Sequence, residues 1–217
     1  SAYSSPIVLV RKKDQTHRFC IDYRRLNKIT EFEVEPLPDS EYIYAQVAKA
    51  QYFTKIDLSK GYWQVPVKKE DRHKLAFSTP DASYQWLVMP FGVQNAPSVF
   101  SRMMRKLLEP FTDMPIYNFM DDLLVATESW QEHMELLGAV MKCLQEAGLT
   151  ARPSKCQLGF STMDYLGHTL THGNLAPDAA KIEQLKDAPQ PTTKTEVRSF
   201  LGFAGYYRRH VPGFSTI

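Results

Sequence analysis

Two adjacent aspartates, Asp121 and Asp122, interrupt an otherwise apolar, strand-forming stretch at residues 115–126 (PIYNFMDDLLVA). Burying a carboxylate without a partner is costly, so such a stretch folds only if something compensates the two charges. Two explanations are open: a hairpin turn that leaves both groups in water, or a divalent cation that binds them. Because consecutive side chains point to opposite faces of a strand, both aspartates reach one site only if the chain turns sharply there.

A third carboxylate, Asp57, lies in a similar apolar setting at residues 52–58 (YFTKIDL). Three carboxylates on two strand-like segments are the ligands that a two-metal phosphoryl-transfer site requires. The alternative is a solvated hairpin tip, and the Asp-Asp pair alone does not decide between them because Asp also favours turns. Other motifs in the chain are needed to choose between a metal site and a solvated hairpin tip.

The composition is that of a globular protein. The chain has 217 residues, enough for one large domain or two small ones, and its 43% hydrophobic content supports a sizeable core. No stretch approaches the ~20 apolar residues of a membrane span, and no signal-peptide pattern opens the chain. The cysteines, Cys20, Cys143 and Cys156, are widely spaced and odd in number, so we expect no zinc site, no disulfide framework and a reducing, intracellular setting. The chain begins inside a strand-like run and stops soon after a helical pattern, so we expect it to be a piece of a longer protein.

Charge is distributed unevenly along the chain. Residues 1–30 carry a net charge of +5, residues 31–41 carry −5, and the last 26 residues carry +3. Basic ends around an acidic centre suit a protein that grips a polyanion while metal ions neutralise its carboxylates. Ordinary solvated surface is the alternative, and charge alone does not exclude it.

Apolar periodicity and turn residues predict strands and helices that alternate irregularly, without an internal repeat. Besides the two aspartate-bearing segments, we expect strands at 5–10 and 17–22, a hairpin of 76–79 with 84–88, and a strand at 165–170. The expected helices start at Asp39 or Ser40 and run to about residue 49, cover 96–108 and 129–148, and follow a cap at Thr193. This mixture predicts an α+β fold in which helices cover one face of a mostly antiparallel sheet.

The clearest helix follows the Asp-Asp segment. Ser129 and Glu132 match a capping box, and Gly148 is a typical C-terminal stop. Four apolar residues recur at helical spacing, and we interpret this stripe as core packing and not as a ligand surface: Met134, Leu137, Met141 and Leu144.

Five motifs in order resemble the reverse transcriptase of a Ty3/Gypsy-type retrotransposon, with retroviral reverse transcriptases as more distant relatives. They are residues 18–27 (RFCIDYRRLN), 53–62 (FTKIDLSKGY), 87–97 (LVMPFGVQNAP), 119–122 (FMDD) and 165–168 (YLGH). The resemblance covers essentially the whole chain. It implies a right-hand polymerase fold, with interleaved fingers and palm in residues 1–170 and the start of the thumb in 171–217.

The resemblance also implies which carboxylates bind metal. Asp57, Asp121 and Asp122 match the family's catalytic ligands for two Mg²⁺ ions, and Mn²⁺ is expected to substitute. Asp57 and Asp121 would bridge the ions, and Asp122 would contribute less directly. The chemistry agrees independently, because phosphoryl transfer depends on charge neutralisation and alignment, and oxygen ligands suit a hard cation.

Further positions match the family's substrate contacts. The residues implied to bind the nucleotide are Lys12, Arg18, Leu58, Tyr62, Phe91, Gly92 and Gln94. The residues implied to contact template and primer are Pro97, Met120, Leu166 and Gly167. Among these, Tyr62 would be a steric gate against a 2′-OH, with a core tyrosine as the alternative. Lys155 is a candidate general acid for the pyrophosphate, although an ordinary surface lysine is the better interpretation.

The implied activity is RNA-directed and DNA-directed DNA synthesis by two-metal phosphoryl transfer. The implied partners are an RNA template, a DNA primer-template, deoxynucleotides, and the RNase H, protease and integrase domains of a parent polyprotein, with no membrane. The implied location is the cytoplasm, including virus-like particles. An RNA-templated RNA polymerase is disfavoured by the aromatic Tyr62. A domesticated, catalytically silent nucleic-acid-binding module is disfavoured by the intact aspartates.

Overall fold

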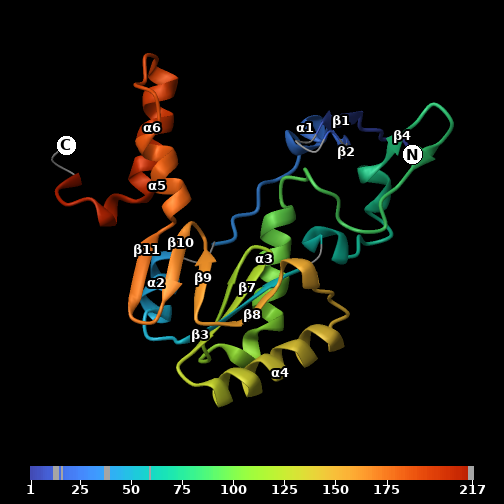
Figure 1. The fold of residues 1–217 in the computed structure, drawn as a ribbon. Coiled ribbons are helices and arrows are strands. Elements are labelled where there is room, and N and C mark those ends of the chain that lie inside the picture. Colours follow the sequence, from blue (N-terminus) through green and yellow to red (C-terminus); the bar gives the residue numbers. More distant parts are fainter. Residues whose placement is uncertain (12–14, 16, 37–39, 59, 215–217) are drawn as a thin grey trace.

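The computed structural model describes residues 1–11, 15, 17–36, 40–58 and 60–214, with backbone only at Arg18 and Ser40. Helices α5 and α6 rise on one side of the molecule, and β1, β2 and β4 lie on the other (Figure 1). The central sheet lies between and below them. Among the described residues, no helix has both the length and the apolar character needed to cross a membrane.

The strands, all paired antiparallel, are β1 (Ile7–Arg11), β2 (His17–Ile21), β3 (Tyr52–Asp57), β4 (Phe77–Ser78), β5 (Ser83–Tyr84), β6 (Ile116–Phe119), β7 (Asp122–Thr127), β8 (Gln157–Phe160), β9 (Thr162–Tyr165), β10 (His168–Thr171) and β11 (Asn174–Pro177). The α-helices are α1 (Arg24–Asn27), α2 (Ser40–Val47), α3 (Ala96–Leu107), α4 (Trp130–Glu146), α5 (Ala179–Lys186) and α6 (Lys194–Tyr206). Short 3₁₀ turns are η1 (Gly61–Gln64), η2 (Arg72–Leu75), η3 (Glu109–Phe111), η4 (Pro153–Lys155) and η5 (Arg208–His210).

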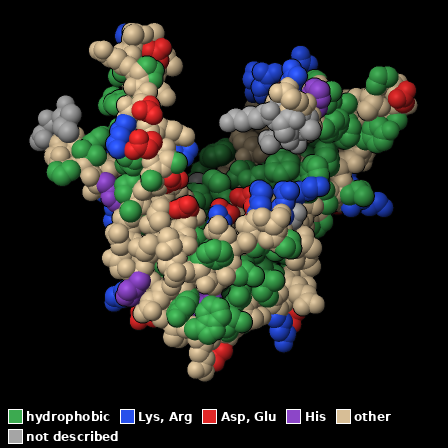
Figure 2. Space-filling model, viewed as in Figure 1, with side chains coloured by type: hydrophobic (Ala, Val, Ile, Leu, Met, Phe, Trp, Pro, Cys, Tyr) green, Lys and Arg blue, Asp and Glu red, His purple; other side chains and the backbone are tan. Residues whose placement is uncertain are grey.

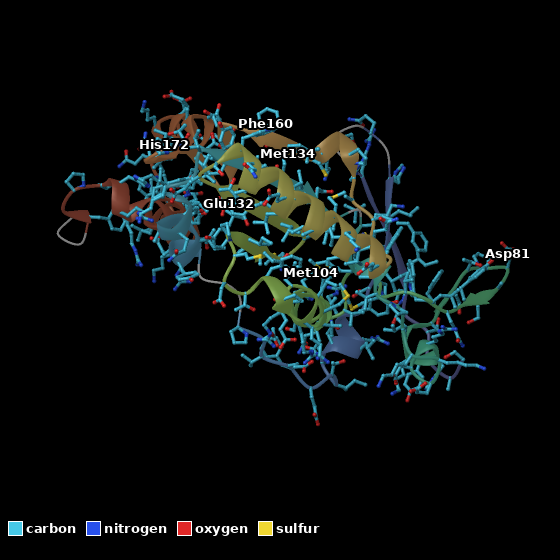
Figure 3. The ribbon with its side chains drawn as sticks, turned by 90° about the horizontal axis from the view of Figure 1, so that it is seen from below. Asp81, Met104, Glu132, Met134, Phe160 and His172 are labelled. Carbon is cyan, nitrogen blue, oxygen red and sulfur yellow. The ribbon has the colours of Figure 1, made fainter. Side chains whose placement is uncertain are left out.

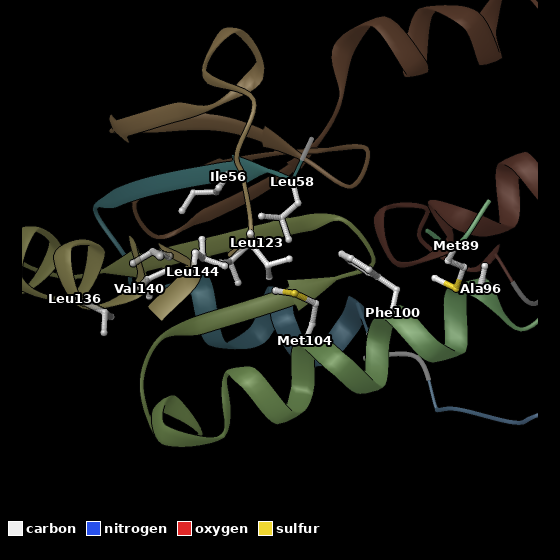
Figure 4. Packing of buried hydrophobic residues seen from close by; sticks show 12 residues of the cluster. Ile56, Leu58, Met89, Ala96, Phe100, Met104, Leu123, Leu136, Val140 and Leu144 are labelled. Atoms are coloured by element: carbon white, nitrogen blue, oxygen red, sulfur yellow. The ribbon is translucent and has the colours of Figure 1, made fainter. Parts of the chain in front are cut away.

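The central sheet has the strand order β6-β7-β3-β8, so both aspartate-bearing segments are neighbours in it. Alternate residues of β3 and β7 face two different cores, as the period of a strand requires. Ile56 and Leu123 pack with α3 and α4 on one face (Figure 4), whereas Phe53 and Leu124 pack with α2 and the β9–β11 sheet on the other. The predicted sheet backed by helices is confirmed, and α2 adds a helix on its second face.

Two hairpins form the side of the molecule opposite α6. Strands β1 and β2 pair from Ile7↔Ile21 to Arg11↔His17, which confirms the predicted N-terminal pair. The predicted hairpin at 76–88 is also present, but its strands β4 and β5 have only two residues each. Asp81 marks its tip, at the end of the molecule away from His172 (Figure 3). A bridge between Ser5 and Phe77 joins the two hairpins.

Helix α4 is confirmed, but its buried face is not the predicted one. The Ser129 hydroxyl accepts a hydrogen bond from the Glu132 N–H at 3.3 Å, as a cap requires. The buried residues are His133, Leu136, Val140 and Leu144. Met134 (Figure 3) and Met141 are 49% and 44% exposed, so the predicted stripe was wrong in its register along the helix and only Leu144 belongs fully to the core.

His133 explains this difference in register. Its ring is fully buried and lies between two hydroxyls, with Nε2 2.6 Å from Thr54 Oγ1 and Nδ1 2.9 Å from Thr127 Oγ1. Hydrogen bonds on both ring nitrogens remove most of the penalty for burying the imidazole. A residue that looks polar in the sequence therefore occupies the core face of α4.

The segment predicted as one strand at 165–170 is a hairpin. Strands β9 and β10 pair at Tyr165↔His168, which leaves Leu166 and Gly167 as a two-residue turn. Strand β11 completes this three-stranded sheet, and α5 and α6 follow it. The capping box of Thr193 and Glu196 at the start of α6 is confirmed. The division of the chain at residues 170 and 171 falls within β10 and stays a prediction.

Candidate active site

The central sheet brings the three aspartates together at the end of two neighbouring strands. Asp57 is the last residue of β3 and is paired directly with Asp122, the first residue of β7. Met120 and Asp121 form the turn from β6, and Met120 takes a φ of +55° to make it. The Leu58 N–H donates to the Asp121 carbonyl at 3.2 Å, which fixes the turn against the end of β3. The predicted sharp turn is therefore confirmed.

Positive charge balances part of this acidic cluster. The Lys155 ammonium lies 3.4 Å from Asp57 Oδ2. Burial raises the pKa of Asp122, Lys55 on β3 lowers it, and the charges of Asp121 and Asp57 add to the rise. Burial, and to a smaller extent the neighbouring carboxylates, thus disfavour the ionised form of Asp122.

The donor chemistry fits a hard divalent cation, because carboxylate oxygens are what Mg²⁺ prefers. Within the described part of the chain, however, no three His, Cys, Asp or Glu side chains converge tightly enough to hold an ion as they stand. One oxygen of Asp57 faces the Lys155 ammonium at 3.4 Å. An ion at this place would have to compete with Lys155 for Asp57.

Tyr62 lies beside the cluster, in η1. Its ring packs against Phe91, with centroids 5.3 Å apart, and edge-on against Phe100 at 5.8 Å. Burial and then the charge of Asp121 raise the pKa of the Tyr62 hydroxyl. The adjacent Gly61 leaves no free space, because a Cβ there would lie 3.2 Å from the Phe100 ring and 3.5 Å from Asp121 Cβ. The ring is thus braced next to the aspartates.

The loop that holds Phe91, Gly92 and Gln94 is clamped by a residue that the sequence reasoning did not single out. Asn27 Nδ2 donates to the Gly92 carbonyl, and Asn27 Oδ1 accepts from the Gln94 N–H, both at 2.9 Å. Gly92 has a φ of +92°, which glycine adopts without strain. Asn27 ends the first of the quoted motifs, so its place in that motif was the available signal.

The remaining predicted residues lie in different surroundings. Leu58 is buried in the core, so only its backbone is available to a nucleotide. Pro97 lies in the first turn of α3, and the Arg18 backbone pairs with Val10 in the first hairpin. Leu166 and Gly167 lie in the β9–β10 turn, which packs toward α2. Lys12 lies outside the described residues.

Tyr165 is a second residue that the sequence reasoning missed. It is buried, and its hydroxyl has no hydrogen-bond partner among the described residues. Burial and the charge of Asp122 raise its pKa. The second sheet therefore reaches the acidic cluster from the side opposite α3.

The space-filling view shows a hollow between the α5–α6 side and the hairpin side of the molecule, with acidic and basic side chains meeting at its floor (Figure 2). The family model described as reverse transcriptase (RNA-dependent DNA polymerase) matches residues 10–170. The chain belongs to the reverse transcriptase family. The resemblance found in the sequence motifs is thereby confirmed.

Relatives of this reverse transcriptase domain are retrotransposon polyproteins. It is 36% identical over its whole length to the retrovirus-related Pol polyprotein from transposon 297 of Drosophila melanogaster and 32% identical to that from transposon gypsy. It is also 32% identical, over 98% of the chain, to the transposon Tf2-3 polyprotein of Schizosaccharomyces pombe. The chain spans only 21%, 22% and 16% of these relatives' lengths.

Solved structures confirm the right-hand polymerase fold. The foamy viral protease-reverse transcriptase in complex with double-stranded DNA superposes with a TM-score of 0.91 at 29% identity, over 100% of this chain and 38% of that one. The same viral protein in complex with an RNA/DNA hybrid gives a TM-score of 0.82 at 28% identity, over 96% of this chain and 28% of that one.

Proposed function

We propose that this reverse transcriptase domain extends a DNA primer with deoxynucleotides along RNA and DNA templates by two-metal phosphoryl transfer, as part of a Pol polyprotein. The observation that carries the proposal is the direct pairing of Asp57 with Asp122, with Asp121 in the adjoining turn. Asp57, Asp121 and Asp122 would hold two Mg²⁺ ions. When bound, such ions activate the attacking hydroxyl and neutralise the charge of the leaving group.

The other side chains have separate tasks in this proposal. The braced Tyr62 ring limits the space for the sugar of the incoming nucleotide. Gly92, held by Asn27, lets the substrate approach the backbone closely. Arg18 would bind the triphosphate, since a guanidinium suits bidentate phosphate contacts.

The relatives support nucleic-acid duplexes as substrates. The foamy viral protein has been solved in complex with double-stranded DNA and with an RNA/DNA hybrid. Both duplexes are products or intermediates of RNA-templated DNA synthesis. Because the matching relatives are polyproteins, we also propose that RNase H, protease and integrase domains accompany this domain in its parent protein.

A primer-extension assay tests the proposal. The 217-residue chain is given a primed RNA template, or the same sequence as DNA, with deoxynucleotides and Mg²⁺ or Mn²⁺. We expect extension on both templates, and less than about one per cent of it in Asp57→Asn or Asp121→Asn, because each change removes a metal ligand. Measurable turnover above that level in either variant contradicts the two-metal assignment.

A binding measurement on the same samples separates the alternative function. A catalytically silent nucleic-acid-binding module binds primed duplex as tightly as an enzyme but extends no primer with either metal. Duplex binding without extension by the unaltered chain therefore replaces our proposal with that one. Thermal unfolding of both variants checks that the fold is intact.

A further inference from the structure

The turn between β9 and β10 has an unusual backbone. Leu166 and Gly167 have φ values of +46° and +75°, both in the left-handed region. Two central residues with positive φ make a tight hairpin turn, but a leucine there costs conformational energy that its surroundings must offset. The two carbonyls of such a turn lie outside the strand ladder and need other donors when buried.

Three tyrosine hydroxyls supply those donors. The Leu166 carbonyl accepts from Tyr44 Oη at 2.7 Å and also from Tyr206 Oη. The Gly167 carbonyl accepts from Tyr207 Oη at 3.0 Å and from the Asp178 N–H at 3.1 Å. We call these three tyrosines and the two carbonyls the tyrosine latch. It joins α2, the β9–β10 turn and the end of α6.

The latch is tightly packed. A Cβ on Gly167 would lie 3.1 Å from Tyr207 Oη and 3.3 Å from the Tyr206 ring. The His168 ring is buried behind the turn, with Nδ1 3.0 Å from Tyr44 Oη. A side chain larger than hydrogen at position 167 would therefore displace one of the α6 tyrosines.

The rest of the C-terminal segment is held much more loosely. Neither α5 nor α6 contains a buried residue, and α6 rises away from the β9–β11 sheet (Figure 1). Tyr207, the C-cap residue directly after α6, is buried and anchors this end of the helix. An ion pair of 2.5 Å between Arg209 and Glu41 adds a second tie to α2. The direction in which α6 stands thus depends on contacts at its C-terminal end.

We propose that Tyr44, Tyr206 and Tyr207 are positioning residues that set the angle of α5 and α6 over the central hollow and thereby the grip on a primer-template duplex. The effect on duplex binding rests on the proposed polymerase function, whereas the effect on the angle of α5 and α6 does not. The same turn touches α2 and α6 and directly follows Tyr165, the last residue of β9.

The first test measures the angle without nucleic acid. Spin labels are placed at Ser199→Cys on α6 and Asp81→Cys at the β4–β5 tip, in a chain whose three native cysteines are replaced by serine. We expect the distance distribution between the labels to broaden in the double variant Tyr206→Phe/Tyr207→Phe, which keeps both rings and loses only the hydroxyls. Tyr84→Phe, in the exposed strand β5, is the matched control and should leave the distribution unchanged.

The second test measures the grip. The Kd for primed duplex should rise by roughly threefold to tenfold in the double variant, as expected for the loss of hydrogen bonds to a buried carbonyl. The rate of single-nucleotide addition at saturating duplex should stay within a factor of about two, because the latch touches no reacting atom. If the tyrosines only stabilised the fold, the double variant would have a lower melting temperature. Its Kd would then not rise while the rate stays nearly unchanged.

The two measurements fail in different ways. An unchanged distance distribution overturns the latch, whatever the polymerase assay gives. A broadened distribution with an unchanged Kd overturns the proposed effect on duplex grip. An unaltered chain that binds no duplex overturns the proposed function, and the distance measurement alone then decides the role of the tyrosines in the angle.

Discussion

The Asp57 carboxylate faces the Lys155 ammonium across 3.4 Å, at the end of strand β3. Lys155 is 56% exposed and Asp57 only 17%, so the lysine can move away while the carboxylate stays. This pair places a partly exposed positive charge where a divalent cation is expected. It also turns a residue that the sequence ranked as ordinary surface into a neighbour of the site.

Lys155→Met should therefore strengthen metal binding to the free protein. Because partly exposed ion pairs are worth only about 0.2–1 kcal/mol, we expect the Mg²⁺ or Mn²⁺ midpoint to fall by about 1.4-fold to fivefold. Calorimetric titration of the protein without substrate measures the midpoint. Lys142→Met, which removes an exposed lysine paired on α4, is the control. An unchanged midpoint in Lys155→Met would show that the ammonium does not compete with the ion.

Tyr62→Ala should admit ribonucleotides much better without a proportional loss of deoxynucleotide incorporation. The reason is steric, because only a 2′-OH would meet the ring. Tyr62→Phe keeps the ring and its packing on Phe91 and Phe100, so it should keep the discrimination. The ratio of kcat/KM for the two nucleotide classes is the measurement. If this ratio is the same in the alanine variant as in the wild type, Tyr62 is a packing residue.

The register of α4 can be checked by a pair of truncations. Leu144 is 2% exposed and Met141 44%. Leu144→Ala should lower the free energy of unfolding by about 2–5 kcal/mol, because it removes buried methylenes and leaves a cavity. Met141→Ala should cost less than about 1 kcal/mol, as for an exposed position. Denaturant unfolding of both variants measures these losses of stability. A larger loss in Met141→Ala than in Leu144→Ala would show that the methionine stripe is the buried face.

His133 should make the packing of α4 on the central sheet sensitive to acid. Burial lowers the pKa of His133 below its ordinary value of 6.5, so the unfolded chain binds the proton more readily than the folded one. The contribution of His133 to the free energy of unfolding is therefore fully present above about pH 6.5. It is lost as the pH drops toward the lowered pKa. His168 and His210 shift in the same direction and add to this loss.

His133→Asn should be less stable than the wild type at pH 7.5 but should lose less stability between pH 7.5 and pH 5. The first effect follows from the lost hydrogen bonds to Thr54 and Thr127, and the second from removing one titrating group. Urea unfolding at several pH values measures both. His172→Asn, at an exposed turn position, controls for the loss of a histidine. Parallel pH curves for wild type and His133→Asn would rule out this histidine as a source of acid sensitivity.

The turn at Asp121 could be predicted from the sequence because it depends on residues that are neighbours in the chain. Two adjacent carboxylates among strand residues admit few solutions, and the Asp121 turn is one of them. The β9–β10 turn was missed for the opposite reason: Leu166 is not a turn-forming residue, and tyrosines from distant helices stabilise it. The contact of Lys155 with Asp57 was not predicted, because 98 residues separate the two in the sequence.

The register of α4 could not be read from the sequence either. Two apolar stripes overlap on the helix, one through Met134 and Met141 and one through Leu136 and Val140. Which of them is buried depends on the hydroxyls of Thr54 and Thr127, which accommodate His133 on the inner face. Helical periodicity gives the spacing of a buried face, and the facing sheet decides which residues occupy it.

The strand order β6-β7-β3-β8 has a consequence for the synthesis of the chain. Strand β3 leaves the ribosome before both of the strands that flank it, and the last pair formed, Phe53↔Phe160, joins residues far apart in sequence. Until then the edge of β3 that pairs with β8 is open to pairing with other chains, and the charged residues of this strand are Lys55 and Asp57. Translation that ends before residue 160 would release a central sheet with this edge unprotected, so truncated products should aggregate and not persist as partly active enzymes.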